Sequence, residues 1–113
     1  MAIILPLAKA IPPYPAEDVA AVLQDELLRT MRARARRKGQ TLPKKDDEAV
    51  MQVIEIDSLT VVELLCSLDD ILPFKATESV VKPGGYESVT AAVDHIVEGI
   101  ERKWKKHHAG GKK

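Results

Sequence analysis

The fold of this chain is decided by the stretch DSLTVVELL, residues 57–65. Asp57 predicts a helix N-cap, because a carboxylate accepts hydrogen bonds from the free backbone N–H groups of a first helical turn. Ser58 would open the helix, and Pro73 would end it, since proline cannot continue the backbone hydrogen-bond ladder. Apolar residues at helical spacing predict one buried face, formed by Leu59, Val62, Leu65, Cys66 and Leu72 and broadened by Val61, Leu64 and Leu68.

Two longer amphipathic helices flank this central one. The first begins at Ala16, after three prolines, and its apolar stripe is formed by Val19, Val22, Leu23, Leu27 and Met31. Beyond Met31 the large apolar residues stop, so we expect the helix to continue as a solvent-exposed, arginine-rich arm that ends at Gly39. Ser88 would cap the last helix, which carries the most regular stripe, formed by Val89, Ala92, Val93, Ile96, Val97, Ile100 and Trp104.

The segments between these helices have no sustained period. Residues 40–56 contain a proline and a charged run, which predicts a long loop with a short helical piece over 46–52. The Pro-Gly-Gly of 83–85 predicts a turn, and at most one helical turn is expected over 77–81. Together these features predict an all-α fold. We expect a small antiparallel helical bundle with three main helices, a short irregular third element, and a long loop between the first and second helix.

The composition limits the classes of protein that this chain can represent. With 113 residues there is room for one small core, and the aromatic share of 4% favours packing of aliphatic helices over a β-sandwich. A single cysteine argues against a disulfide framework or a multi-cysteine zinc site and fits a cytoplasmic location. The apolar start, residues 1–11, is shorter than a membrane span and lacks the charge of a secretory signal. We see no paired carboxylates, phosphate loop or metal cluster, so we do not expect an enzyme.

A net charge of zero hides strong segregation along the chain. Residues 29–45 carry eight Lys and Arg side chains and no acid, residues 46–101 carry thirteen acids and two lysines, and residues 102–113 carry six more basic side chains. The acidic segment favours a basic partner. No aromatic residues are interleaved with the arginines for stacking on bases, so nucleic acid is not an expected partner. An acidic partner or an anionic membrane surface stays open for the basic segments.

The central stretch resembles the Asp-Ser-Leu motif of acyl carrier proteins. The motif, at 57–59, comes at the end of the long loop and the start of the second helix, and it is followed by Val-Glu-Leu at 62–64 and an acidic pair at 69–70. The final helix, VTAAVDHI at 89–96, is similar to the last helix of that family. Spacing and helix order match over 54–101, and helix order alone matches back to residue 16. The resemblance implies the helical bundle of the acyl-carrier type.

The resemblance also implies a prosthetic group. Ser58 would be esterified by 4′-phosphopantetheine, whose terminal thiol carries an acyl chain as a thioester. A phosphodiester there would lie at a helix start, where free N–H groups favour an anion. Asp57 would cap the helix and help the phosphopantetheinyl transferase to hold its metal ion. Leu59 would line a partner contact or the mouth of an acyl cleft.

Partner enzymes are implied in the same way. Val62 would share the contact made by Leu59, and the acidic Glu63, Asp69 and Asp70 would face basic docking patches on acyl-transferring and acyl-activating enzymes. The sequence departs from the family at three places: Glu55 stands where many members have glycine, the acidic third helix is replaced by residues 75–85, and the first helix is rich in arginine. These departures imply a specialised carrier that serves a dedicated pathway.

We divide the chain into a Pro-rich apolar N-terminal extension (1–15), a carrier domain (16–104) and a basic C-terminal tail (105–113), and we expect a cytoplasmic monomer. The predicted function is a non-catalytic carrier of acyl intermediates for fatty acid, lipid or polyketide-like synthesis, with a peptidyl or aminoacyl carrier as a close variant. The alternative is an unmodified helical adaptor that docks an acidic partner or a membrane surface through its arginine-rich helix. Cys66 is expected to be a buried small hydrophobe, and His95 is expected to have a structural or surface role.

Overall fold

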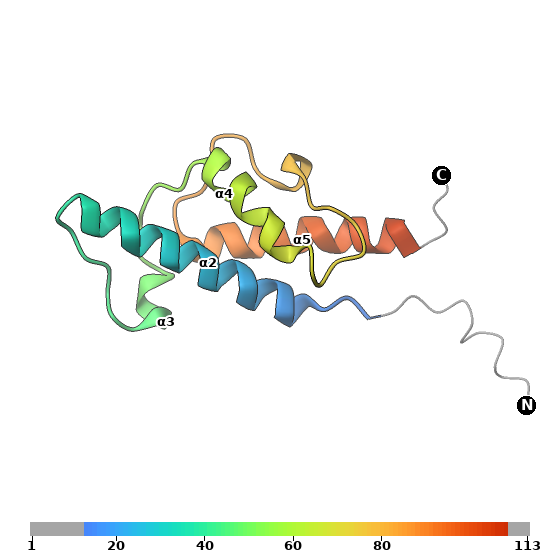
Figure 1. Cartoon of the computed structure of the whole chain (residues 1–113), viewed down its shortest axis with the longest axis horizontal. Coiled ribbons are helices and arrows are strands. Elements are labelled where there is room, and N and C mark those ends of the chain that lie inside the picture. The colour runs from blue at the N-terminus through green and yellow to red at the C-terminus, as the bar shows by residue number, and fades with distance from the viewer. Residues whose placement is uncertain (1–12, 109–113) are drawn as a thin grey trace, which may run out of the picture.

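The computed structural model describes residues 13–108, and all of the regular structure in this range is helical (Figure 1). The elements are α2 (Ala16–Arg37), α3 (Asp46–Ala49), α4 (Ser58–Leu64), the 3₁₀ helices η1 (Leu65–Leu68) and η2 (Glu78–Val80), and α5 (Val89–His108). Within residues 13–108 there is no β-strand, and an isolated antiparallel bridge joins Ile56 to Tyr86. The predicted all-α fold is therefore confirmed.

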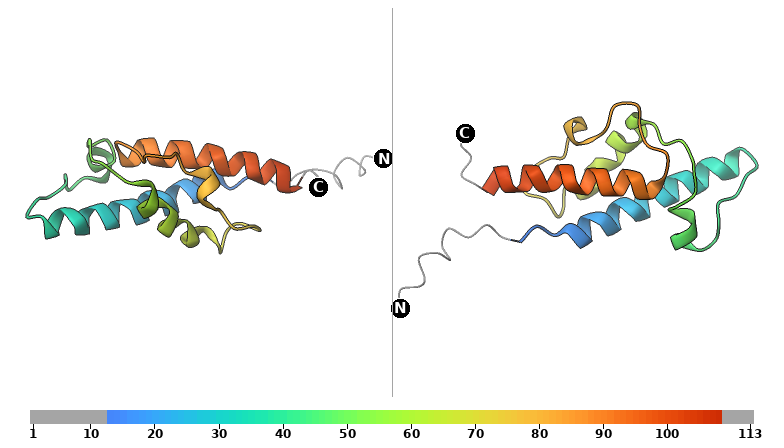
Figure 2. Two further views of the ribbon diagram at one scale, coloured as in Figure 1. Left: turned by 90° about the horizontal axis from the view of Figure 1, so that it is seen from above. Right: turned by 180° about the vertical axis from the view of Figure 1, so that it is seen from behind.

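The two long helices, α2 and α5, run antiparallel, and α4, η1 and η2 pack against them (Figures 1 and 2). Tyr14, just before α2, donates its hydroxyl to the carbonyl of Val97 at 2.9 Å, and the centroid of its ring lies 5.7 Å from that of Trp104. The start of α2 is thus fixed against the second half of α5. The stripe predicted for α5 is buried, with Val97 half-buried. α2 ends at Arg37, close to the predicted end, and Gly39, just past the cap residue Lys38, has a φ of 76° that suits glycine after a helix C-terminus.

The central helix is shorter than predicted and buries a different face. α4 passes into η1, so regular structure ends at Leu68 and not near residue 72. Leu59 is 64% exposed and Cys66 is exposed, so the prediction that both face the core is wrong. The buried positions are Thr60, Val61, Leu65, Leu68 and Leu72. Apolar residues occupy most positions of this stretch, so their spacing alone does not determine which side turns inward.

One core joins the helices, and most of its volume is aliphatic, as the composition predicts. Its largest fully buried side chains are Leu23, Leu27, Ile56, Leu65, Leu68, Ile96 and Ile100. The short elements complete it, because η2 buries Val80 against α5. Gly99 makes this approach possible, since a Cβ there would lie 3.2 Å from the Cβ of Val80. The short helical turns predicted within 46–52 and 77–81 are confirmed as α3 and η2.

The arginine-rich end of α2 is less exposed to solvent than predicted. Arg32 donates to the carbonyl of Pro43 at 2.8 Å and forms an ion pair with Asp46 at 2.8 Å. Arg34 donates to the hydroxyl of Thr60 at 2.6 Å. The expected solvated arm therefore anchors the following loop and α4, because the arginine forks find acceptors on segments that are distant in sequence.

The ends of the described region bear on the predicted division of the chain. Residues 1–12 of the N-terminal extension and residues 109–113 of the basic tail lie outside the described residues. The first four residues of that tail, 105–108, continue α5 as helix. Among residues 13–108, no helix has the length and apolar character needed to cross a membrane.

Candidate functional site

The junction between Asp57 and Ser58 is an extended chain that enters a helix. Asp57 has extended backbone angles (φ −76°, ψ 157°), and its carboxylate accepts a hydrogen bond from the N–H of Thr60 at 3.0 Å, which confirms the predicted N-cap. Side-chain and backbone hydrogen bonds from Thr60 lower the pKa of Asp57, with a smaller contribution from the charge of Arg34. Ser58 is the first residue of α4, as predicted. It is half-exposed, and its hydroxyl has no hydrogen-bond partner among residues 13–108.

The segment that leads to Asp57 is held by the chain that precedes α5. Ile56 and Tyr86 exchange backbone hydrogen bonds of 2.9 and 2.8 Å, and the N–H of Ile54 donates to the carbonyl of Glu87 at 2.8 Å. Gly85 allows the two chains to meet, because it has a φ of 87° and any Cβ there would overlap the carbonyl oxygen of Ile56. The predicted loop over residues 40–56 is therefore anchored at the end closest to Ser58, a pairing that sequence analysis did not predict.

Arg34 contacts the first turn of α4 from the side of α2. It donates to the hydroxyl of Thr60, which is only 4% exposed and which also donates its N–H to Asp57. Arg34, Thr60 and Asp57 thus form one connected set around the start of α4. Sequence analysis did not single out Arg34, and the available signal was its spacing of one helical turn from Lys38, which places both cations on one face of the helix.

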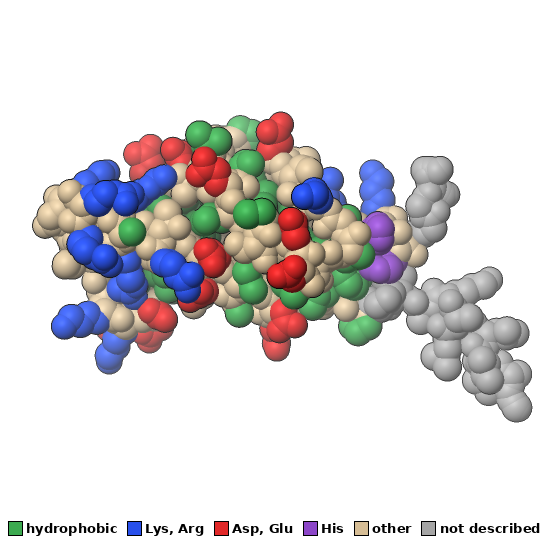
Figure 3. All heavy atoms as spheres, viewed as in Figure 1, with side chains coloured by type: hydrophobic (Ala, Val, Ile, Leu, Met, Phe, Trp, Pro, Cys, Tyr) green, Lys and Arg blue, Asp and Glu red, His purple; other side chains and the backbone are tan. Residues whose placement is uncertain are grey.

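The residues predicted to meet partner enzymes lie on the surface that α4 and η1 form. Val62 is half-buried, and the exposed members are Leu59, Glu63, Asp69 and Asp70. Asp69 also forms an ion pair with Lys75 at 3.5 Å. Figure 3 shows acidic side chains distributed over the face that carries α4, whereas Lys and Arg gather at the end of the molecule formed by the last turns of α2 and the loop after it. The charge segregation of the sequence is therefore also a segregation in space.

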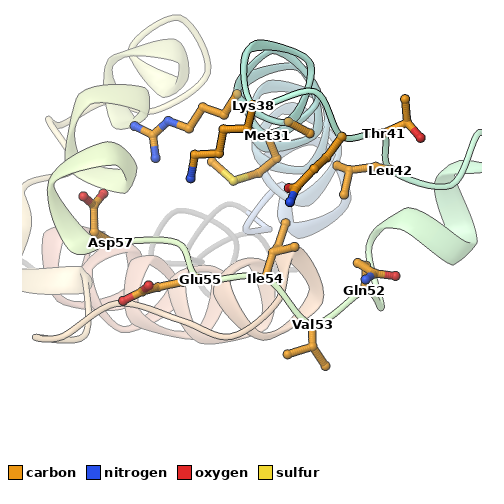
Figure 4. A pocket seen from close by; sticks show the side chains of 12 residues that line it. Met31, Lys38, Thr41, Leu42, Gln52, Val53, Ile54, Glu55 and Asp57 are labelled. Carbon is orange, nitrogen blue, oxygen red and sulfur yellow. The ribbon is translucent and has the colours of Figure 1, made fainter.

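An open pocket lies between the C-terminal half of α2 and the segment that leads to Asp57 (Figure 4). Its volume is about 670 Å³, within the range of small-molecule sites. Figure 4 shows Met31 across from Ile54, with Asp57 at one end and Thr41 and Gln52 at the other. We call it the α2 pocket, and it is lined by Met31, Arg34, Ala35, Lys38, Gln40, Thr41, Leu42, Gln52, Val53, Ile54, Glu55 and Asp57.

Cys66 is exposed, contrary to the sequence expectation, whereas His95 makes a structural contact. The exposed thiol of Cys66 donates to the carbonyl of Glu63 at 3.3 Å, as a surface residue of η1. His95 has its Nδ1 2.8 Å from the hydroxyl of Tyr86, which accepts from the N–H of Lys82 at 2.7 Å. His95 thus supports the turn that carries Gly85. In the described part of the chain, no group of three or more His, Cys, Asp or Glu side chains is arranged to hold a metal ion.

Comparison of the chain with protein-family models, with curated proteins and with solved structures returned no match. The function therefore has to be inferred from the geometry around Ser58, which combines three features. Ser58 is partly exposed and its hydroxyl has no hydrogen-bond partner among residues 13–108, the backbone before it is fixed by hydrogen bonds, and a pocket with two cations on its wall begins at the preceding residue, Asp57.

Proposed function

We propose that this chain is an acyl carrier protein that holds a 4′-phosphopantetheine arm on Ser58 and has no catalytic activity of its own. The observation that carries the proposal is the partly exposed Ser58 at the first position of α4, with a hydroxyl that has no hydrogen-bond partner in the described range. A modifying enzyme needs a hydroxyl that it can reach and deprotonate. Asp57 holds that hydroxyl in place, because its carboxylate ties the extended segment to the first turn of α4.

The attachment reaction defines the role of Ser58. Its oxygen would attack the phosphorus of coenzyme A that bears the pantetheine, forming a new O–P bond. The bond from that phosphorus to the neighbouring bridging oxygen breaks, adenosine 3′,5′-bisphosphate leaves with the electron pair, and the serine proton passes to a base of the transferase. When attached, the group supplies a thiol that carries acyl chains as thioesters. The residues present fit the group, because Arg34 and Lys38 line the adjacent pocket and supply positive charge for a phosphodiester.

The surface beside Ser58 supports docking of partner enzymes. Leu59 exposes an apolar side chain next to the attachment site, Glu63 exposes a carboxylate on α4, and Asp69 and Asp70 expose carboxylates in the turn that follows η1. Exposed carboxylates favour partners with basic patches, because long-range attraction accelerates encounter and orients the two surfaces. Half-buried Val62 would add an apolar contact to the docking surface that the acidic side chains form.

The arrangement of the helices supports the acyl-carrier type of bundle as part of this proposal. α2, α4 and α5 supply three main helices, η2 supplies the short third element, and the chain between α2 and α4 supplies the long loop. The acyl groups that the carrier would serve belong to fatty acid, lipid or polyketide-like synthesis, and a peptidyl or aminoacyl cargo is the close variant. The same arm and the same serine would serve either cargo.

The alternative function is an unmodified adaptor that docks through the basic end of α2. The gathering of Lys and Arg at that end favours it (Figure 3). However, Arg32 is already bound to the loop after α2, through the carbonyl of Pro43 and the carboxylate of Asp46, which leaves fewer arginines for a partner.

Two variants separate the carrier from the adaptor. Ser58→Ala removes the attachment oxygen, and the pair Arg36→Glu and Arg37→Glu reverses two exposed charges of α2. After incubation with coenzyme A, magnesium and a broad-specificity phosphopantetheinyl transferase, we expect the intact mass of the charge-reversed variant to rise by one phosphopantetheine and that of Ser58→Ala to stay unchanged. Ser67→Ala, in the adjoining η1, is the matched control and should load like wild type. Loading of folded Ser58→Ala would overturn the proposal.

A further inference from the structure

The α2 pocket begins at Asp57, the residue before Ser58, and follows the non-helical segment of residues 52–57 away from it. Asp57 lines the near end and Gln52 the far end (Figure 4). The five residue steps between them span at most about 17 Å of chain. Ser58 does not itself line the pocket, but it follows Asp57 directly in the chain, so a linear group attached to Ser58 starts one residue from the near end.

The near end of the pocket is lined by two cations from one face of α2. Arg34 and Lys38 are one helical turn apart, and both side chains line the pocket. Arg34 reaches the first turn of α4, where its guanidinium lies 2.6 Å from the hydroxyl of Thr60. Within residues 13–108 neither Arg34 nor Lys38 forms an ion pair. A guanidinium has five N–H donors in a planar fork, so one bond to Thr60 leaves donors that suit phosphate oxygens.

Beyond the cations the lining is first apolar and then mixed. Met31 and Ile54 lie across from one another in the middle of the pocket, and Leu42 lies at the far end with the polar Thr41 and Gln52 (Figure 4). A phosphopantetheine arm has the same order of chemistry along its length: a phosphodiester, a branched hydrocarbon, two amides and a thiol. The sequence of charge, apolar contact and hydrogen-bonding groups in the pocket thus complements the arm from the attachment point outward.

We propose that the α2 pocket is the seat of the arm: Arg34 and Lys38 bind its phosphodiester, and the pantetheine chain lies between α2 and residues 52–57 with its thiol near Thr41 and Gln52. This inference rests on the proposed function, since it requires an arm on Ser58. It assigns a role to the arginine-rich end of α2, because these cations hold the arm against the carrier until a partner enzyme draws it out.

Two carboxylates line the pocket and repel a phosphodiester bound there, so they limit how tightly the arm is held. The Asp57 carboxylate is bound to the first turn of α4. Glu55 is exposed and lines the same wall. The repulsion between Glu55 and a phosphodiester weakens the seat and keeps the arm exchangeable, so Glu55→Gln should hold the arm more tightly than wild type.

The test compares amide ¹H–¹⁵N spectra of the unloaded and the loaded full chain, with loading first verified by intact mass. A seated arm shifts the amide signals of residues 52–54 and of residues 40–42, and the latter are more than ten positions from Ser58 in the chain. Lys38→Glu, compared only after its own loading has been verified by intact mass, should lose these distant shifts. Leu42→Trp fills the pocket without touching the contact of Arg34 with Thr60, and it should lose them too. Arg37→Glu, an exposed residue of the same helix outside the pocket lining, is the matched control and should retain them.

The outcomes separate this inference from the function on which it rests. If the chain is not loaded at all, the proposed function fails. If loading succeeds and shifts are confined to residues that adjoin Ser58, or if Lys38→Glu and Leu42→Trp leave the distant shifts unchanged, the function stands and the seat is overturned. If the distant shifts disappear in Arg37→Glu as strongly as in Lys38→Glu, overall charge and not the pocket is responsible, and the seat is again overturned.

Discussion

Gly84 and Gly85 provide a matched pair that tests how the start of α4 is held. Both glycines have positive φ, 92° and 87°, so alanine at either position meets the strain of the left-handed region, about 1–2 kcal/mol. A Cβ on Gly84 meets no atom within 4 Å. A Cβ on Gly85 would overlap the carbonyl oxygen of Ile56 and lie 2.9 Å from the Cα of Asp57. Backbone must move in the second case and need not move in the first.

The expected magnitudes follow from the bonds that this movement breaks. Ile56 and Tyr86 exchange two backbone hydrogen bonds, each worth about 1 kcal/mol. We therefore expect Gly84→Ala to lower the free energy of unfolding by about 1–2 kcal/mol and Gly85→Ala by about 3–4 kcal/mol. Urea denaturation followed by circular dichroism measures both, and a slope of about 1 kcal/mol per molar urea makes the difference readily visible.

Gly85→Ala also tests whether the pairing of Ile56 with Tyr86 affects the loading of Ser58. The displaced carbonyl belongs to the residue before Asp57, so Gly85→Ala should also slow loading of Ser58, while Gly84→Ala should leave the loading rate close to that of wild type. Equal destabilisation by the two alanines, or a Gly85→Ala chain that loads as fast as wild type, would show that the bridge does not position the start of α4.

Two further predictions concern the N-terminal anchor and the acidic surface. Tyr14→Phe removes the hydrogen bond to Val97 and should lower the free energy of unfolding by about 1 kcal/mol. Burial, with the charge of Glu101, raises the pKa of Tyr14 from 10.0 to about 12, so the unfolded tyrosine ionises first and the wild-type fold should lose stability between pH 10 and 12. The phenylalanine variant should show a smaller loss over this range in urea titrations at different pH values. Glu63→Lys, Asp69→Lys and Asp70→Lys together should lower the second-order rate of loading by the transferase about tenfold at low salt without changing the far-ultraviolet spectrum, and an unchanged rate would remove these carboxylates from the docking surface.

The parts of the fold that sequence predicts are those in which one physical rule acts alone. The stripe from Val89 to Trp104 has a single period and is buried as expected, and Gly39 follows the end of α2 because its positive φ favours glycine. The central stretch has apolar residues on most sides, so periodicity did not determine its phase. Leu59 and Cys66 were consequently assigned to the core, although both are exposed.

The parts of the site that sequence did not predict depend on contacts between distant segments. Asp57 and Ser58 can be recognised from the local sequence, because capping involves neighbours in the chain. The bond from Arg34 to Thr60 and the pairing of Ile56 with Tyr86 join residues that lie 26 and 30 positions apart. No local pattern encodes such pairs. The α2 pocket, whose lining comes from α2 and from the distant residues 52–57, was therefore beyond what a single sequence reveals.

The measurement that tests the central claim most directly is the intact mass of the wild-type chain before and after incubation with coenzyme A, magnesium and a phosphopantetheinyl transferase, followed by fragmentation to locate the added group. The carrier account predicts a gain of one phosphopantetheine, located on Ser58 and on no other residue. An unchanged mass with several transferases that load other carriers in the same assay would contradict it. Ser58 would then be a helix residue without a prosthetic group, and the basic end of α2 would become the leading functional surface.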